Sequence, residues 1–227
     1  MNLPPVERLV DSKLDPPVVG FLHRSTTPPR DALVLTHGAG ANCQAPHLIA
    51  VAEAFAGAGF LVLRCDLPFR QQSPQGPPPF GSAERDREGL RSAVSLVRNL
   101  VPDRVFLGGH SYGGRQATML AASEPSLVAG LLLMSYPLHP PRKPEQLRTQ
   151  HFPSLRAPAL FVHGARDPFG SENEMDKALK LIPARTRLLE IDGAGHDLKT
   201  AAKQKTGDSE PLATRVIREF QEYFGKP

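Results

Sequence analysis

Short apolar runs alternate along the chain with segments of helical spacing. The runs that predict buried strands cover residues 18–22, 31–36, 60–63, 105–107, 128–134, 159–163 and 187–191. Apolar residues three or four positions apart predict amphipathic helices at residues 48–55, 82–100, 116–122, 171–181 and 212–223. Because strands and helices alternate, we expect an α/β fold, a mostly parallel sheet with helices on both faces.

The sequence also makes predictions about individual strands, helix ends and connections. Residues 18–22 read as an early edge strand, and residues 67–81, rich in Pro, Gly and Gln without a period, read as a loop. Ser82 is expected to cap the helix 82–100, whose predicted apolar face holds Leu90, Val94, Val97 and Leu100. Residues 67–81 and 136–155 are the only generous insertions, so we expect no large cap domain.

Length and composition favour one globular domain. The chain has 227 residues, 40% of them hydrophobic, and shows no internal repeat, so we expect residues 1–227 to form a single domain. Its 2 cysteines, Cys43 and Cys65, fit no metal-ligand spacing and are expected to be reduced thiols.

Charge and hydropathy argue against several classes of protein. The formal net charge of +4 comes from scattered basic residues without a basic run, so no nucleic-acid partner is expected. Residues 1–10 lack the apolar core of a signal peptide, and no stretch reaches the roughly 18 apolar residues of a membrane span. We therefore expect a cytoplasmic protein without membrane contact.

The most informative stretch follows the predicted strand 105–107. Gly109-His110-Ser111-Tyr112-Gly113 matches G-x-S-x-G, the pattern of a nucleophile elbow between a strand and a helix. Glycines without Cβ atoms let strand and helix converge around Ser111, and the helix N-terminus places amide groups beside its hydroxyl. On its own the pentapeptide could equally be a structural turn, so its interpretation depends on the partners of Ser111.

Two candidate partners follow the last two predicted strands. A neutral serine hydroxyl needs a base, and His196, after the final strand, is the candidate. Asp167, after the preceding strand, is the candidate acid that orients the imidazole. The chain order Ser, Asp, His and the position of each residue after a strand predict a catalytic triad.

Other carboxylates are less favoured as the acid. Asp192 and Asp197 lie too near the candidate base in sequence to be its favoured partners. The position after the strand that ends near Ser135 offers no carboxylate. Asp167 itself has the alternative interpretation of a turn residue before Pro168.

Acyl transfer also needs donors for the negative charge on the former carbonyl oxygen. The backbone N–H of Tyr112 is one candidate, because it follows the nucleophile. The turn after the strand 31–36 should supply the other, from Ala39 or Gly40. His37, in the same turn, is interpreted as a structural residue rather than a second base.

An open pocket for a small ester is expected between the two long connections. Arg64, Arg70 and His139 are candidates to contact a substrate carboxylate there. The alternative for all three is an ordinary solvated surface position. No metal site and no cofactor are expected.

These motifs together resemble the α/β-hydrolase superfamily, and they span nearly the whole chain. The segments 35–40, 46–48 and 135–139 resemble a compact branch near the dienelactone hydrolases, which includes the testis-expressed and KANSL3-like hydrolase-domain proteins. The resemblance implies hydrolysis of carboxyl esters without a cofactor. Dienelactone hydrolases proper carry a cysteine nucleophile, whereas this chain has Ser111, which argues against carrying over their substrate.

The sequence thus predicts a serine hydrolase for a small or short-chain carboxylic ester or thioester, acting through an acyl-serine. Perhydrolysis or peptide cleavage by the same residues stays open, because selectivity depends on pocket shape. A non-catalytic interaction module or complex subunit that kept the fold is the alternative of a different class.

Overall fold

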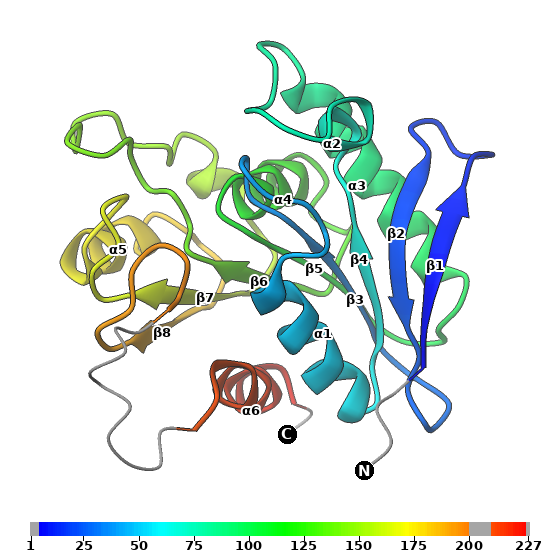
Figure 1. Ribbon diagram of the computed structural model, residues 1–227. Coiled ribbons are helices and arrows are strands. Elements are labelled where there is room, and N and C mark those ends of the chain that lie inside the picture. Colours follow the sequence, from blue (N-terminus) through cyan, green and yellow to red (C-terminus); the bar gives the residue numbers. More distant parts are fainter. Residues whose placement is uncertain (1–4, 200–209, 226–227) are drawn as a thin grey trace.

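The computed structural model describes residues 5–199 and 210–225, which form one sheet flanked by helices (Figure 1). The sheet is 8-stranded, in the order β1-β2-β4-β3-β5-β6-β7-β8. In chain order the strands are β1 Val6–Asp11, β2 Val18–His23, β3 Ala32–Thr36, β4 Leu61–Cys65, β5 Val105–His110, β6 Gly130–Met134, β7 Ala159–Gly164 and β8 Thr186–Ile191. The strands from β4 to β8 in this order are parallel, which confirms the predicted mostly parallel sheet.

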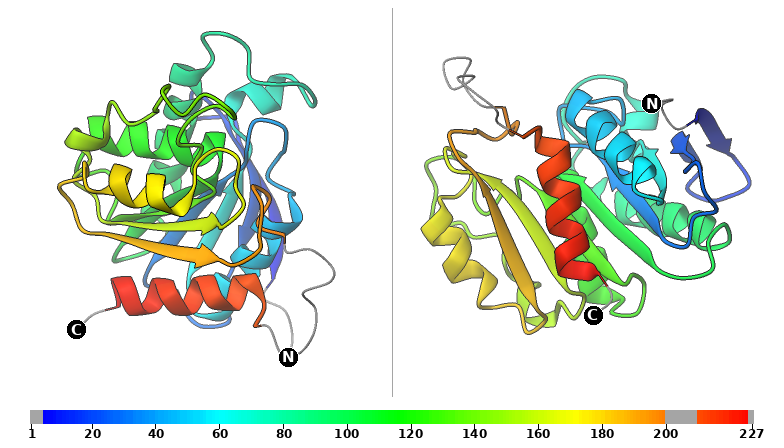
Figure 2. Two further views of the ribbon diagram at one scale, coloured as in Figure 1. Left: turned by 90° about the vertical axis from the view of Figure 1, so that its left-hand side faces the viewer. Right: turned by 90° about the horizontal axis from the view of Figure 1, so that it is seen from below.

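Helices cover both faces of the sheet, as the view from below in Figure 2 shows. The helices are α1 Pro46–Gly57, α2 Pro68–Gln72, α3 Ala83–Arg98, α4 Tyr112–Ser123, the short 3-10 helix η1 Phe152–Ser154, α5 Glu172–Leu179 and α6 Leu212–Phe224. α1 and α6 pack over one buried cluster, and α3, α4 and α5 pack over the other. Since β3, β5, β6 and β7 are buried on both faces, their sequences are continuous apolar runs.

β1 is a strand that the sequence pattern does not predict. It pairs antiparallel with β2, and β2 pairs with β4 on its other side, so the prediction of an edge strand at residues 18–22 is wrong. Val6 and Val10 of β1 are 46% and 56% exposed. An edge strand with so little buried surface has no continuous apolar run that would reveal it.

The connection at residues 67–81 also differs from its prediction, because it contains α2. The carboxylate of Asp86 in α3 holds this short helix by accepting the amide of Phe69 at 3.0 Å. Ser82 stands at the N-cap position of α3, but its hydroxyl donates to Asp86 at 3.4 Å and makes no cap hydrogen bond. Leu100 is 46% exposed and lies beyond the end of α3, so it does not belong to the apolar face.

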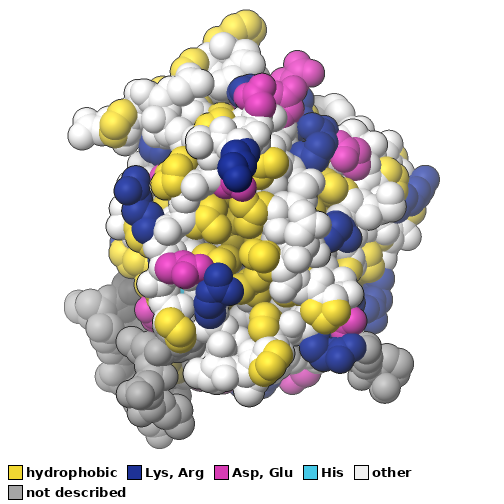
Figure 3. Space-filling model, turned by 90° about the vertical axis from the view of Figure 1, so that its right-hand side faces the viewer, with side chains coloured by type: hydrophobic (Ala, Val, Ile, Leu, Met, Phe, Trp, Pro, Cys, Tyr) yellow, Lys and Arg dark blue, Asp and Glu magenta, His cyan; other side chains and the backbone are white. Residues whose placement is uncertain are grey.

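The surface on the β1 side of the sheet mixes charge and apolar groups. Figure 3 shows apolar side chains gathered at the centre of this face, with basic and acidic groups interspersed around them. Within residues 5–199 and 210–225, no helix is both long and apolar enough to cross a membrane. The cytoplasmic location and the expected lack of nucleic-acid and membrane partners stay predictions.

Candidate active site

Ser111 occupies the sharp turn between β5 and α4. Its φ of 51° and ψ of −116° lie outside the regions that ordinary side chains favour. A Cβ on Gly113 would lie 2.5 Å from the carbonyl oxygen of His37, and a Cβ on Gly109 would lie 2.9 Å from the Gly113 carbonyl carbon. Only glycine therefore fits on either side of the turn, which is the physical content of the G-x-S-x-G pattern.

The structure brings the three predicted triad residues together. His196 Nε2 lies 2.8 Å from Ser111 Oγ, and His196 Nδ1 lies 2.8 Å from Asp167 Oδ2. An ionised carboxylate can only accept, so Nδ1 of the neutral imidazole carries the proton and Nε2 accepts from the serine hydroxyl. This tautomer is the one that general-base chemistry at Ser111 requires.

Asp167 is fixed at the carboxyl end of β7. Its side chain is fully buried, and Oδ1 accepts the amide of Phe169 at 2.9 Å while Oδ2 faces His196. His163, in β7, donates Nε2–H to the carbonyl of Gly170 at 2.6 Å and so steadies the same loop. The acid that faces the histidine is therefore Asp167, whereas Asp197 pairs with a lysine two residues on.

Two side chains that the sequence analysis did not assign hold His196 in place. The ring of Phe169 packs against the imidazole with centroids 4.2 Å apart. His110 Nε2 donates to the backbone carbonyl of His196 at 2.8 Å. Burial is the main cause that lowers the pKa of His110 to about 4, so this residue is neutral near pH 7. Because His110 directly precedes Ser111 in the G-x-S-x-G pattern, the sequence could have suggested a role for it at the site.

Two of the three predicted oxyanion donors lie at the pocket of Ser111. Within the described part of the chain, the amides of Tyr112, Ala39 and Gly40 have no hydrogen-bond acceptor, whereas the Gly113 amide donates to the carbonyl of His37 at 3.2 Å. Tyr112 and Ala39 line the pocket that contains Ser111, and Gly40 is not among its lining residues.

His37 has the structural role expected from the sequence. Its Nδ1 donates to the carbonyl of Gly38 at 2.9 Å, and its Nε2 accepts the amide of Leu67 at 3.1 Å. Burial lowers its pKa, so the neutral ring holds two loops together.

The pocket at the serine has a volume of about 230 Å³. Its lining residues come from the turn after β3, the elbow, and the loops after β6 and β7: Ala39, Ser111, Tyr112, Arg115, Pro137, Arg148 and Phe169. Its two basic side chains, Arg115 and Arg148, are not the ones that the sequence predicted.

Arg64 is buried in the scaffold instead of lining this pocket. It is 3% exposed, donates Nε–H to His23 Nε2 at 2.7 Å, and also donates to the carbonyl of Cys43. Burial and the neighbouring guanidinium lower the pKa of His23 to about 4, which keeps it a neutral acceptor. The prediction that Arg64 contacts the substrate is therefore wrong.

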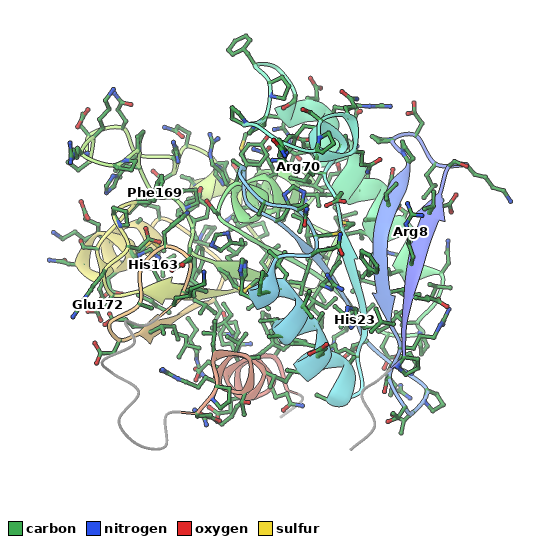
Figure 4. All side chains as sticks on the ribbon, in the orientation of Figure 1. Arg8, His23, Arg70, His163, Phe169 and Glu172 are labelled. Carbon is green, nitrogen blue, oxygen red and sulfur yellow. The ribbon has the colours of Figure 1, made fainter. Side chains whose placement is uncertain are left out.

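Arg70 is likewise engaged by the backbone. Its guanidinium donates to four carbonyl oxygens at 2.7–2.9 Å, those of Ala39, Ala41, Ser73 and Gly76. Arg70 belongs to α2, and Figure 4 shows it at the upper side of the sheet. Since its donors are used, Arg70 fixes the turn that carries the Ala39 amide and does not face a substrate.

The prediction that His139 contacts the substrate is also wrong. It is 5% exposed, its Nδ1 donates to the carbonyl of Pro140 at 2.8 Å, and its Nε2 lies 3.6 Å from a Glu174 carboxylate oxygen. His139 thus packs between its own loop and α5. Among the described residues, no group of three or more His, Cys, Asp or Glu could hold a metal ion.

The sheet order, the strained serine at the elbow and the Ser111–His196–Asp167 chain define an α/β hydrolase. In agreement, a family model for the alpha/beta hydrolase domain matches residues 29–224, and the chain belongs to this family. The expected superfamily is confirmed, and the fold is like that of a dienelactone hydrolase. The narrower resemblance to the testis-expressed and KANSL3-like proteins stays a prediction.

Several solved structures have the same fold. A dienelactone hydrolase from Anabaena variabilis has a TM-score of 0.73 at 22% identity, over 98% of each chain. Est1E from Butyrivibrio proteoclasticus, solved with ferulic acid bound, has a TM-score of 0.74 at 16% identity, over 92% of this chain and 97% of that one. XC6422 from Xanthomonas campestris, an α/β serine hydrolase without a lid, has a TM-score of 0.68 at 15% identity, over 100% of both. At these identities the likeness shows the fold.

Proposed function

We propose that this protein is a serine hydrolase that cleaves a small or short-chain carboxylic ester or thioester through an acyl-serine intermediate. The observation that carries the proposal is the hydrogen-bond chain from Ser111 through His196 to Asp167, with 2.8 Å at each step. The amides of Tyr112 and Ala39 beside the serine support it, because they offer donors for an oxyanion.

In the proposed reaction, Ser111 Oγ attacks the acyl carbonyl while His196 Nε2 takes its proton. Asp167 stabilises the imidazolium that forms, and the amides of Tyr112 and Ala39 hold the negatively charged oxygen. His196 then protonates the leaving alcohol or thiol, and the acyl-serine remains. A water molecule that gives its proton to His196 attacks this acyl group, releasing the acid and restoring Ser111.

The size of the pocket supports a small substrate. Its volume of about 230 Å³ is below the roughly 300–1,000 Å³ of common ligand pockets. Its walls include Pro137 and Phe169, which suit a short acyl chain. Perhydrolysis and peptide cleavage would use the same acyl-serine, so they are distinguished by the acceptor and the leaving group, not by the triad.

A panel of 4-nitrophenyl esters tests the proposal. Acetate and butyrate esters should be hydrolysed with higher kcat/KM than the octanoate ester, because the longer chain exceeds the pocket. Ser111→Ala should lower kcat by at least about 10³-fold, since the nucleophile is lost. Its thermal midpoint should stay close to that of the wild type, because only a hydroxyl is removed.

Equal rates for the wild type and Ser111→Ala would contradict the proposal and assign the observed hydrolysis to another group. No turnover of any ester or thioester by the folded wild type would favour the alternative, a non-catalytic interaction module or complex subunit.

A further inference from the structure

Two arginines outside the triad form part of the wall of the Ser111 pocket. Arg115 lies one turn after the nucleophile in α4, where its amide donates to the Ser111 carbonyl at 3.0 Å. Arg148 comes from the segment after β6. Its amide donates to the Leu138 carbonyl at 2.8 Å, and its carbonyl accepts the Tyr136 hydroxyl at 2.6 Å. The backbone of each arginine is therefore held in place beside the serine.

Within the part of the chain that the structure describes, neither guanidinium pairs with a carboxylate, and no acidic residue lines the pocket. Arg115 Nε is buried without a hydrogen-bond partner, and Arg148 makes one long side-chain hydrogen bond, 3.3 Å to the Pro137 carbonyl. By contrast, Arg104 is paired with Asp31 at 2.7 Å. A buried donor without an acceptor costs free energy, so a ligand that supplies one is favoured.

The charges of these arginines are not balanced locally. Burial, followed by the nearby charge of Arg115, lowers the pKa of Arg148. Burial and the charges of Arg115 and Arg87 lower the pKa of His151 to about 4. Two guanidinium groups without a paired carboxylate thus line the pocket of the nucleophile, where an anion would be stabilised.

We propose that the Ser111 pocket selects an ester that carries a second, negatively charged carboxylate, bound by Arg115 and Arg148. This inference rests on the proposed hydrolase function. The planar guanidinium matches a carboxylate with two parallel hydrogen bonds. Because serine and arginines share one pocket of about 230 Å³, the ester and the carboxylate belong to one small molecule. A half-ester of a short dicarboxylic acid has this chemistry.

The test compares two esters that differ mainly in charge, mono-4-nitrophenyl glutarate and 4-nitrophenyl hexanoate. The wild type should hydrolyse the glutarate with at least about tenfold higher kcat/KM, the size of a charge-assisted hydrogen bond. Arg115→Gln and Arg148→Gln should each lower the glutarate-to-hexanoate ratio by about tenfold, mainly through KM for the glutarate. Arg156→Gln, which removes an exposed arginine outside the pocket, is the matched control and should leave the ratio unchanged.

A second measurement needs no variant. Free glutarate should inhibit hexanoate hydrolysis competitively at concentrations where glutaramide, its neutral analogue, does not. If Ser111-dependent hydrolysis of hexanoate is seen without glutarate preference or glutarate inhibition, the anion site is refuted while the hydrolase function stands. If neither ester is hydrolysed, the proposed function fails and the anion site fails with it.

Discussion

Asp167 determines which nitrogen of His196 carries a proton. Its carboxylate accepts from Nδ1 at 2.8 Å, which leaves Nε2 free to accept from Ser111. In Asp167→Asn the side-chain amide can donate to Nδ1, and the proton then resides on Nε2, where it cannot accept from the serine. We expect kcat to fall by about 10⁴-fold with little change in the thermal midpoint.

The control for this variant is Asp192→Asn, which alters an exposed carboxylate that lies near the same histidine in sequence. Steady-state kinetics with 4-nitrophenyl butyrate should show a rate within about twofold of the wild type for this control. A near-normal kcat for Asp167→Asn would mean that another group orients His196.

The triad could be predicted from the sequence, but the basic residues around it could not. Ser111, Asp167 and His196 each follow a strand, and the carboxyl ends of parallel strands meet at one edge of the sheet. No such rule predicts where an arginine side chain lies. Arg70 donates to backbone carbonyls, whereas Arg148 reaches the pocket from the long connection after β6. Sequence shows that a residue is basic, and only the folded loops show which acceptor it reaches.

Among the helices and strands, the sequence predicts the buried elements better than the exposed or short ones. β3 and β5 are buried on both faces and were predicted from their apolar runs. β1 is largely exposed, and α2, Pro68–Gln72, is a single short turn held by the carboxylate of Asp86. Tertiary contacts rather than local periodicity make these two elements, so the pattern of apolar residues did not reveal them.

The contact between β3, the elbow and α4 gives a prediction for stability. In Gly113→Ala the new Cβ would lie 2.5 Å from Thr36 Cγ2 and 2.5 Å from the carbonyl oxygen of His37. Backbone has to shift to admit it, so we expect about 1–3 kcal/mol of destabilisation in urea unfolding. Turnover should fall as well, because the shift displaces Ser111.

The matched control is Gly57→Ala at the end of α1, where a Cβ would meet nothing within 4 Å. This change should stabilise the protein by roughly 0.4–1 kcal/mol, since alanine restricts the unfolded chain. Equal stability of the two variants would show that strand and helix at the elbow are not as tightly packed as described.

For the whole molecule, buried histidines couple stability to pH. Burial is the main cause that lowers the pKa from 6.5 to about 4 for each of three side chains, His23, His110 and His151. The unfolded chain therefore binds more protons than the folded one between these values. Their contribution to stability is complete above pH 6.5 and is lost as the pH falls towards 4.

We expect the thermal midpoint to fall between about pH 7 and about pH 5, measured by circular dichroism at constant ionic strength. Two carboxyl groups act in the opposite direction, because burial raises the pKa of Asp86 and a hydrogen bond with Glu172 raises that of Glu190. They are outnumbered, since burial also lowers the pKa of His37 and His47. His151→Gln should flatten the profile, because one of the three histidines is removed. A midpoint that stays constant down to about pH 5 would refute this coupling.

The central claim is that the whole fold serves to activate Ser111, and covalent labelling tests it most directly. A fluorophosphonate probe, which reacts with activated serines, should label the purified wild type, and peptide mapping should place the label on Ser111. Labelling should disappear in Ser111→Ala while its thermal midpoint is retained. A folded wild type that takes no label, or takes it at another residue, would contradict the claim.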